Sequence, residues 1–96
     1  MKAVLHPLVH VDIAEAMEFY ERVGGAKLAA DFFYEYERVL QRILGRPMSF
    51  PTWKSVLRRA IFSRFPFQIL YSIESTHIFV LVIRHERRHP DFGLNR

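Results

Sequence analysis

An unbroken run of six apolar residues, 78–83, is the feature that most restricts how this chain can fold. A run this short and this apolar is typical of a central β-strand covered on both faces. Just before it, residues 67–74 have a large apolar side chain at every second position, the period of a half-covered strand. The two segments therefore predict neighbouring strands of a sheet that has another layer packed against it.

Two further strands are expected, one at residues 56–63 and one in the apolar run 3–6, which Pro7 stops. The stretch between them has the spacing of helices. Asp12 is a suitable N-cap, and Glu15, three residues later, completes a capping box. Apolar residues then recur at helical spacing, so a first helix is predicted to begin at this cap.

The first helix is expected to end at the pair Gly24-Gly25, and a second helix is expected over residues 26–44. Gly45 stands where a C-terminal cap belongs, and Pro47 prevents the helix from continuing. Two helices joined by a Gly-Gly turn predict an antiparallel helical hairpin.

The predicted fold class is α+β, with the order β-α-α-β-β-β in a single domain, 1–96. The helical hairpin is expected to pack on one face of a mostly antiparallel four-stranded sheet. The other face of the sheet is then expected to be partly open to a partner.

The charge of the chain is unevenly distributed. Residues 1–48 contain six Lys/Arg and seven Asp/Glu, whereas residues 49–96 contain eight Lys/Arg and three Asp/Glu, and the net charge is +4. The excess of positive charge in the second half predicts a polyanionic partner there, either a nucleic acid or an acidic protein segment.

Several classes of protein are disfavoured by what the sequence lacks. It has no cysteine, no apolar segment long enough to cross a bilayer and no secretory signal, so a cytoplasmic protein without contact to a membrane is expected. The five histidines have no metal-binding spacing on a helix, and no glycine-rich phosphate loop is present. Neither a metal nor another cofactor is therefore expected.

Several short sequence motifs make this order of elements specific to one group of proteins. Residues 57–71 read LRRAIFSRFPFQILY, which resembles the sheet core of RelE/ParE toxins, where a paired arginine opens one strand and RFP(F/Y)xIxY opens the next. Residues 80–90 read VLVIRHERRHP and resemble the end of the family's last strand, VLAVxHxRRxP. Residues 15–21 and 28–32 resemble its first two helices. The chain thus resembles the RelE/ParE superfamily, nearer its ParE-like branch of plasmid stabilisation proteins.

The resemblance implies the toxin of a bacterial type II toxin–antitoxin system, held inactive by a cognate antitoxin. In this family the antitoxin wraps the toxin with a largely helical segment that lies in grooves beside the sheet and the hairpin. The second helix here has a broad apolar side, and an antitoxin helix would cover the part that one neighbouring helix does not need. Its candidate antitoxin-binding residues are Phe33, Tyr36 and Leu40, although for each of them alone a core position is the better explanation.

The resemblance leaves two kinds of target open, DNA gyrase and the ribosome with its messenger RNA. Our leading interpretation is a ParE-like toxin that binds and blocks gyrase, with the basic rim of the sheet as its contact surface. The candidate target-binding residues are Arg58, Arg59, Arg64, Arg84, Arg87 and Arg88.

The alternative is a RelE-like, ribosome-dependent messenger endoribonuclease, which needs no metal. Arg59, Arg64 and Arg84 would hold the scissile phosphate, and Lys54 or His85 would move protons. His89 is a further substitute for a proton-transfer group. The RelE-like branch relies on several lysines and a C-terminal tyrosine, whereas this chain has a single lysine in that region and Phe92 near its end. Whether any residue is catalytic stays open on the sequence alone.

A plain nucleic-acid-binding module is a third possibility. The chain has only three lysines, and it lacks the solvent-facing aromatic pairs that single-strand binders present on a strand. The sequence therefore favours the toxin interpretations.

Overall fold

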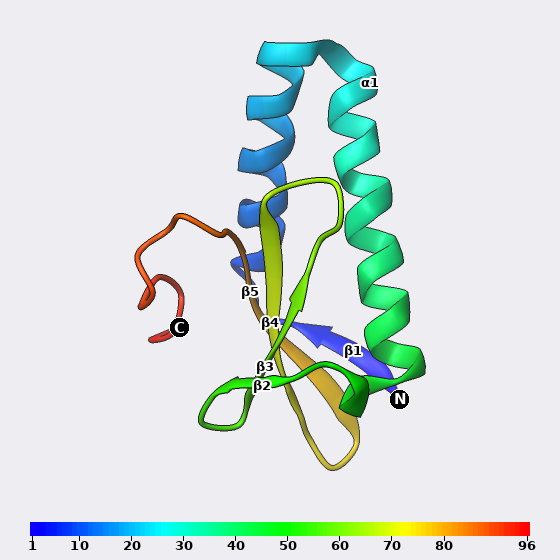
Figure 1. Cartoon of the computed structure of the whole chain (residues 1–96), viewed down its shortest axis with the longest axis vertical. Helices are drawn as coiled ribbons and strands as arrows, with labels where there is room; N and C mark the ends of the chain where they lie inside the picture. The colour runs from blue at the N-terminus through cyan, green and yellow to red at the C-terminus, as the bar shows by residue number, and fades with distance from the viewer.

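The structure, a computed structural model, describes all 96 residues. Its elements follow in the order β1 (Lys2–Leu5), α1 (Val9–Gly45), the 3₁₀ turn η1 (Pro47–Ser49), β2 (Thr52–Lys54), β3 (Leu57–Ile61), β4 (Phe67–Ile73) and β5 (His77–His85). Two layers result, with α1 packed along the sheet (Figure 1). No helix combines the length and the apolar character that are needed to cross a membrane.

The sheet has five strands rather than the four expected, in the order β1-β5-β4-β3-β2. β1 pairs with β5 in parallel, and the other neighbours are antiparallel, so the sheet is mixed. The unexpected strand is β2, which is only three residues long and forms one edge. The three strands predicted in the second half are confirmed as β3, β4 and β5, and they lie side by side in that order.

The expected hairpin of two separate helices is corrected. A single helix, α1, spans 37 residues, and its one non-helical residue is Gly25 (φ 87°, ψ 177°). At Gly25 the helix bends sharply, so that its first arm, before this glycine, and its second arm, after it, run beside each other without an intervening loop (Figure 1). The rings of Tyr20 and Phe32 stack between the arms, with centroids 5.5 Å apart.

The start of α1 also differs from the expectation. The helix begins at Val9, with Leu8 at the N-cap and no side chain capping it. The backbone N–H of Leu8 instead donates to Nδ1 of His6 at 3.0 Å. Asp12 is therefore not a cap: it lies inside the first turn with only 6% of its surface exposed.

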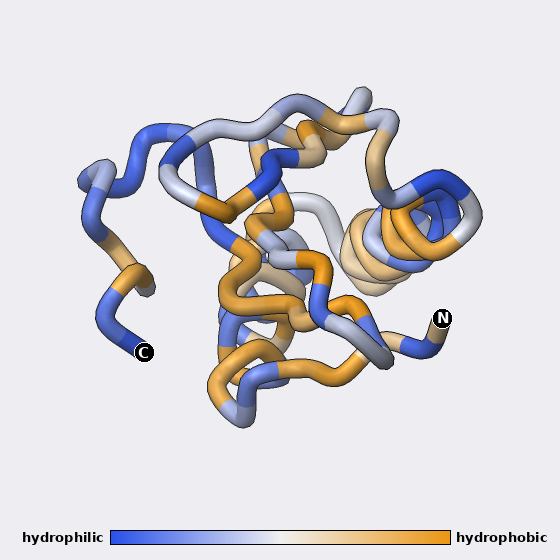
Figure 2. Tube along the Cα trace, turned by 90° about the horizontal axis from the view of Figure 1, so that it is seen from below, coloured by the Kyte–Doolittle hydropathy of each residue, from blue (hydrophilic) through white to orange (hydrophobic).

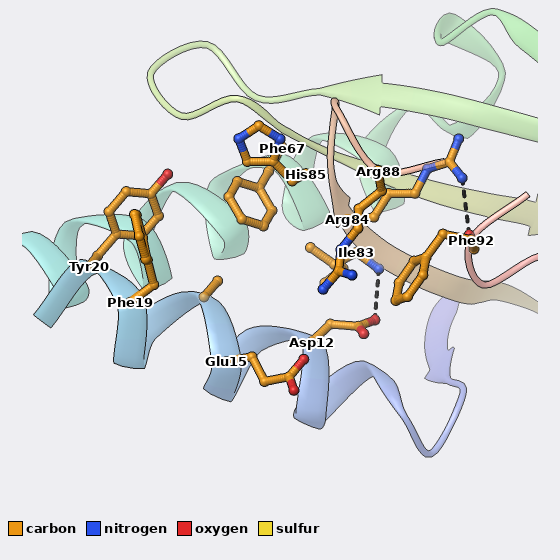
Figure 3. Close-up of a pocket in the computed structure, with 11 residues that line it drawn as sticks. Asp12, Glu15, Phe19, Tyr20, Phe67, Ile83, Arg84, His85, Arg88 and Phe92 are labelled. Atoms are coloured by element: carbon orange, nitrogen blue, oxygen red, sulfur yellow. Dashed lines mark hydrogen bonds between the residues drawn. The ribbon is translucent and has the colours of Figure 1, made fainter. Parts of the chain in front are cut away.

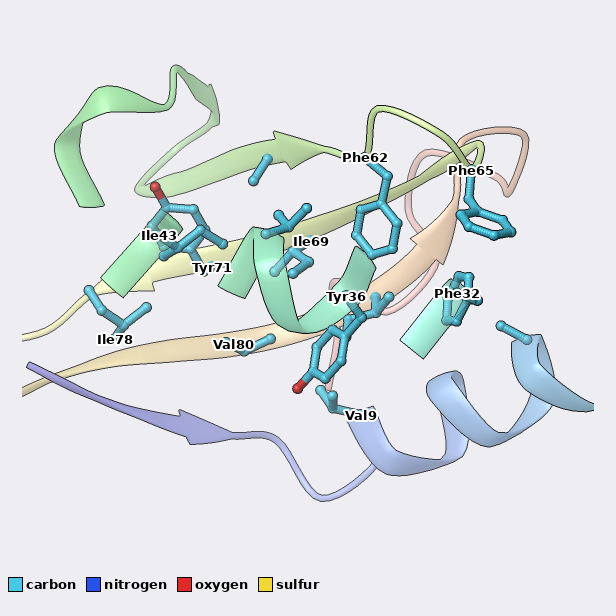
Figure 4. Close-up of a cluster of buried hydrophobic side chains, with 14 residues drawn as sticks. Val9, Phe32, Tyr36, Ile43, Phe62, Phe65, Ile69, Tyr71, Ile78 and Val80 are labelled. Carbon is cyan, nitrogen blue, oxygen red and sulfur yellow. The ribbon is translucent and has the colours of Figure 1, made fainter. Parts of the chain in front are cut away.

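The main core lies between α1 and the sheet (Figure 4). Phe32 is fully buried at its centre, with its ring 4.9 to 5.6 Å from four other aromatic rings. On β4, residues at every second position point into this core, as a period of two predicts, whereas on β5 the alternation shifts by one residue between Val80 and Ile83. The register between β4 and β5 shifts at Leu70 and Tyr71, so that Leu81 has no direct partner on β4.

The far face of the sheet, turned away from α1, is covered more fully than expected. A second apolar cluster of Leu70, Leu81 and Val82 lies there, and Phe92 and Trp53 pack against it. The segment after β5, residues 86–96, lies beside the strands on the side away from the second arm of α1 (Figure 1), and is largely hydrophilic (Figure 2). The chain's own C-terminal segment thus occupies part of the face that the sequence predicts to be partly open.

Candidate functional site: a cationic cluster beside Trp53

Two arginines from different strands meet at the indole ring of Trp53. The Cζ atom of Arg84, at the end of β5, lies 4.9 Å from the ring centroid, and that of Arg59, on β3, lies 6.0 Å from it. The register explains this placement: Arg59 is opposite Leu70 and Arg84 is opposite Gln68, so both arginines belong to the far face of the sheet on either side of β4. Guanidinium groups pack favourably on an indole face.

No carboxylate forms an ion pair with either charge. Neither guanidinium lies within 4.0 Å of an acidic side chain. The Nε atoms of Arg59 and Arg84 are both buried without a hydrogen-bond partner. Burial lowers the pKa of Arg84, and the positive charge of Arg59 lowers it further, while Asp91 acts in the opposite sense. Two like charges held together in this way favour the binding of an anion.

The guanidinium of Arg84 is held by the C-terminal segment. Its Nη1 donates to the carbonyl oxygens of His89, Pro90 and Phe92, over 3.3, 2.7 and 3.0 Å. Lys54 extends the positive surface at the end of β2 and forms an exposed ion pair with Asp91 at 3.6 Å. We call Lys54, Arg59 and Arg84, gathered around Trp53, the cationic cluster.

The other predicted arginines do not join this cluster. Arg58 is on the opposite side of β3, where its Nη1 donates to the carbonyl oxygen of Phe50 at 2.6 Å. Arg64 lies in the turn between β3 and β4 and pairs with Asp31 of α1 at 3.1 Å. Arg87 and Arg88 are exposed in the C-terminal segment, and the Cζ of Arg88 lies 4.4 Å from the ring of Phe92. The predicted trio of phosphate-holding arginines is therefore divided, because only two of its members are together.

The candidate proton-transfer groups are also separated from the cluster. His85 lies on the α1 side of β5, where its ring packs edge-on against Phe67 at 5.3 Å. Its Nδ1 accepts the backbone N–H of Arg87 at 3.0 Å. His89 is exposed, and its Nδ1 accepts the backbone N–H of Asp91 at 3.1 Å. Both histidines thus use a ring nitrogen for local turns, and His85 is on the face opposite to the paired arginines.

A groove of about 240 Å³ lies between the first arm of α1 and the end of β5. Figure 3 shows Phe19, Tyr20 and Phe67 at one end of this groove, with Glu15 and Phe92 at the other. Phe19 lines this groove and is 47% exposed. The groove therefore offers an apolar floor with charged groups at its margin.

The predicted antitoxin-binding residues have different environments. Phe33 is 36% exposed on the second arm of α1, with its ring 5.7 Å from that of Tyr36. Tyr36 is buried in the main core, and burial raises the pKa of its phenol. Leu40 is half-buried and packs against the same core. Of the three, only Phe33 is exposed.

The sequence does not predict the roles of four residues in the site and its surroundings. Trp53 is the only tryptophan and stands beside Lys54, but this signal is readable only once β2 is recognised as a strand. Glu35 is a buried carboxylate that accepts the backbone N–H of Arg64 at 2.6 Å. Asp12 and Arg96 form a buried ion pair between residues 84 positions apart, which no local pattern indicates.

Comparisons with known proteins agree with this geometry at the level of the fold. No family model matches the chain, and no curated protein does. Among solved structures, the chain is similar to one described as the chromosomal ParDE TA system from P. aeruginosa, with a TM-score of 0.80 and 15% sequence identity. The similarity covers 88% of this chain and 95% of that chain. The two-layer arrangement of a bent α1 on a mixed sheet is thus a fold that this chain shares with that structure.

Proposed function

We propose that the chain is the toxin of a type II toxin–antitoxin pair and that it acts by binding its target rather than by cleaving it. The similarity in fold to a chain of a ParDE system supports the class. The cationic cluster supports the mode of action, because the half-buried Arg59 and the exposed Lys54 offer positive charge to an anion, with the buried guanidinium of Arg84 behind them. The target that fits the ParE-like resemblance is DNA gyrase.

The separation of His85 from the cluster is the observation that favours binding over cleavage. RNA hydrolysis without a metal requires proton-transfer groups within hydrogen-bond reach of the reacting oxygens, about 2.6–3.2 Å. His85 packs against Phe67 on the other face of β5, so its ring is directed away from the indole of Trp53 where Arg59 and Arg84 meet. Phe92, in the segment that covers the cluster, has no proton to exchange.

Messenger cleavage is the second candidate, and one observation favours it. Arg59 and Arg84 lie together, with Lys54 close by on β2, an arrangement that would suit a scissile phosphate. In that case Lys54 would be the proton-transfer group, and its ammonium would have to leave Asp91 to reach the substrate.

The partner that would neutralise the toxin is a cognate antitoxin. The groove beside Phe19 and the exposed ring of Phe33 are the apolar surfaces that a helical segment of such a partner could cover. The simplest check of the toxin class is to look for a neighbouring reading frame that encodes a small acidic protein.

The experiment adds the purified chain to a supercoiling assay with DNA gyrase and, separately, to translating ribosomes whose messages are mapped by primer extension. We expect supercoiling to be inhibited and the messages to stay intact. Arg59→Gln is expected to weaken inhibition about tenfold, as the loss of one charge-assisted contact implies. Arg64→Gln is the matched control, since it removes the same charge at an exposed site outside the cluster.

Codon-phased cuts in the messages, together with normal supercoiling, would overturn this proposal in favour of the nuclease. Equal inhibition by the wild-type chain and Arg59→Gln would remove the cationic cluster from the mechanism.

A further inference from the structure

The segment after β5 is attached to the rest of the molecule by side chains rather than by the sheet. After Glu86, whose N–H donates to the carbonyl oxygen of Pro66, the backbone hydrogen bonds of residues 88–96 all end within residues 85–93. We call residues 86–96 the C-terminal clasp. Because no ladder of backbone bonds fixes it, the position of the clasp depends on a few side-chain contacts.

The strongest of these contacts is the ion pair between Arg96 and Asp12. The Nη1 and Nη2 atoms of Arg96 donate to the carboxylate of Asp12, each over 2.7 Å, and the side chains of Arg96 and Asp12 are only 9% and 4% exposed. Arg96 also donates to the carbonyl oxygen of Leu81 at 3.2 Å. The carboxylate of Asp12 accepts a further bond from the backbone N–H of Ile83 at 3.0 Å, a bond drawn in Figure 3. A bidentate pair of this kind fixes both distance and orientation.

The clasp in turn determines where the guanidinium of Arg84 lies. All the hydrogen bonds of that guanidinium go to clasp carbonyl oxygens, those of His89, Pro90 and Phe92. The bond to Phe92 is drawn in Figure 3. Gly93 packs so closely on β5 that an added Cβ would be 2.7 Å from Cγ2 of Val82. The carbonyl oxygens that hold Arg84 therefore keep their places only while the clasp is docked.

We propose that Asp12 and Arg96 are positioning residues for the cationic cluster. Their ion pair docks the clasp, and the docked clasp directs the guanidinium of Arg84 onto the ring of Trp53 at 4.9 Å. Neither residue belongs to the cluster itself, because Asp12 lies on α1 and Arg96 ends the clasp. The role of this arrangement in target binding rests on the proposed function, whereas the positioning of Arg84 does not.

Trp53 makes the inference testable without any partner. It is the only tryptophan of the chain, so its fluorescence reports directly on the cluster. The variants are Arg96→Gln and Asp12→Asn, and the second of these can still accept the N–H of Ile83. Glu18→Gln is the matched control, because it breaks an exposed ion pair with Arg22 on the same arm of α1.

We expect both clasp variants to shift the emission of Trp53 to longer wavelength and to increase its quenching by acrylamide, while far-ultraviolet circular dichroism stays that of the folded chain. Glu18→Gln should match the wild type. Unchanged emission and quenching in folded Arg96→Gln would overturn the inference. If Asp12→Asn fails to fold, Arg96→Gln alone decides, since Arg96 lies outside the helix and the sheet.

The gyrase assay then separates this inference from the proposed function. Arg96→Gln is expected to raise the concentration needed for half-inhibition about tenfold, comparable to the loss of a contact to Arg84 itself. A wild-type chain that leaves gyrase active, combined with altered Trp53 fluorescence in the variants, would refute the proposed target and keep the positioning role. Full inhibition by a variant whose fluorescence has changed would refute the link between the clasp and target binding.

Discussion

The carboxylate of Glu35 accepts the backbone N–H of Arg64 over 2.6 Å and thereby ties the second arm of α1 to the turn between β3 and β4. The hydroxyl of Ser63, in the same turn, donates to this carboxylate over 3.4 Å. Glu35 is only 6% exposed, so its charge is stabilised by these donors rather than by water. The turn that follows β3 is thus anchored on the helix layer.

Replacing Glu35 should destabilise the fold. We expect Glu35→Ala to lower the free energy of unfolding by about 2 kcal/mol, because it leaves the backbone N–H of Arg64 without its partner. Urea denaturation followed by circular dichroism measures this change. Glu37→Ala, two residues along on the exposed side of α1, is the control and should change stability by less than about 0.5 kcal/mol. Equal effects of the two substitutions would contradict a role for the buried carboxylate.

The bend in α1 should depend on the backbone of Gly25. Its φ of 87° with ψ of 177° is a conformation that is essentially restricted to glycine. Gly25→Ala is therefore expected to cost about 1–3 kcal/mol, measured by thermal or urea unfolding. The side chain itself has room, since nothing lies within 4 Å of the position that a Cβ would take.

Gly45→Ala is the natural comparison for the bend. Gly45 has the same open surroundings but a helical conformation at the end of α1, so alanine should be neutral or slightly stabilising there. If Gly25→Ala and Gly45→Ala changed the free energy of unfolding equally, backbone strain at Gly25 would not be the cause of the destabilisation.

Phe33 and Tyr36 should separate partner binding from folding. Phe33→Ala is expected to leave the stability of the isolated chain within about 0.5 kcal/mol of wild type, since the ring is partly exposed. Tyr36→Ala should cost about 3–5 kcal/mol because it empties a core position. Calorimetric titration with the cognate antitoxin should show weaker binding for Phe33→Ala, and wild-type affinity would place the antitoxin elsewhere.

Alkaline pH should unfold the chain through Tyr71. Burial raises the pKa of its phenol, whose hydroxyl donates to the carbonyl oxygen of Pro47 at 2.5 Å. A phenol with a higher pKa in the folded state stabilises the fold fully below the unfolded value of about 10, and this contribution is lost as the pH rises through the folded pKa. The free energy of unfolding should thus fall above pH 10, where urea midpoints can be measured. The decrease in the free energy of unfolding above pH 10 should be smaller in Tyr71→Phe than in the wild type. If the two proteins lose stability equally with rising pH, Tyr71 is not the source of the decrease.

Much of the sheet could be predicted because its signals are local. The period of two in β4 and the apolar run of β5 placed both strands to within two residues of their observed ends. A period of two also accounts for the opposite faces of Arg58 and Arg59 on β3, since Arg58 bonds to Phe50 and Arg59 packs near Trp53. β2 was missed because three residues after Pro51 give no readable period.

The errors concern contacts between distant parts of the chain. Asp12 has the side chain of an N-cap, but the partner that explains its position is Arg96, which a local capping rule cannot reveal. Arg64 matched the family phrase beside Arg59, yet its backbone is drawn to Glu35 and its guanidinium to Asp31, away from the cluster. The sequence predicts two separate helices at the glycine pair, whereas the structure has one bent helix, because a bend and a break between helices have the same sequence signal.

The parallel pairing of β1 with β5 has a consequence for how the molecule comes into being. Of the five strands of this sheet, β1 is synthesised first, but its only neighbour, β5, is synthesised last. At about 5–20 residues per second, several seconds of synthesis separate the two. During that interval β1 and the first arm of α1 have no completed sheet on which to settle, and this unfinished intermediate exposes the apolar surfaces that the mature protein conceals.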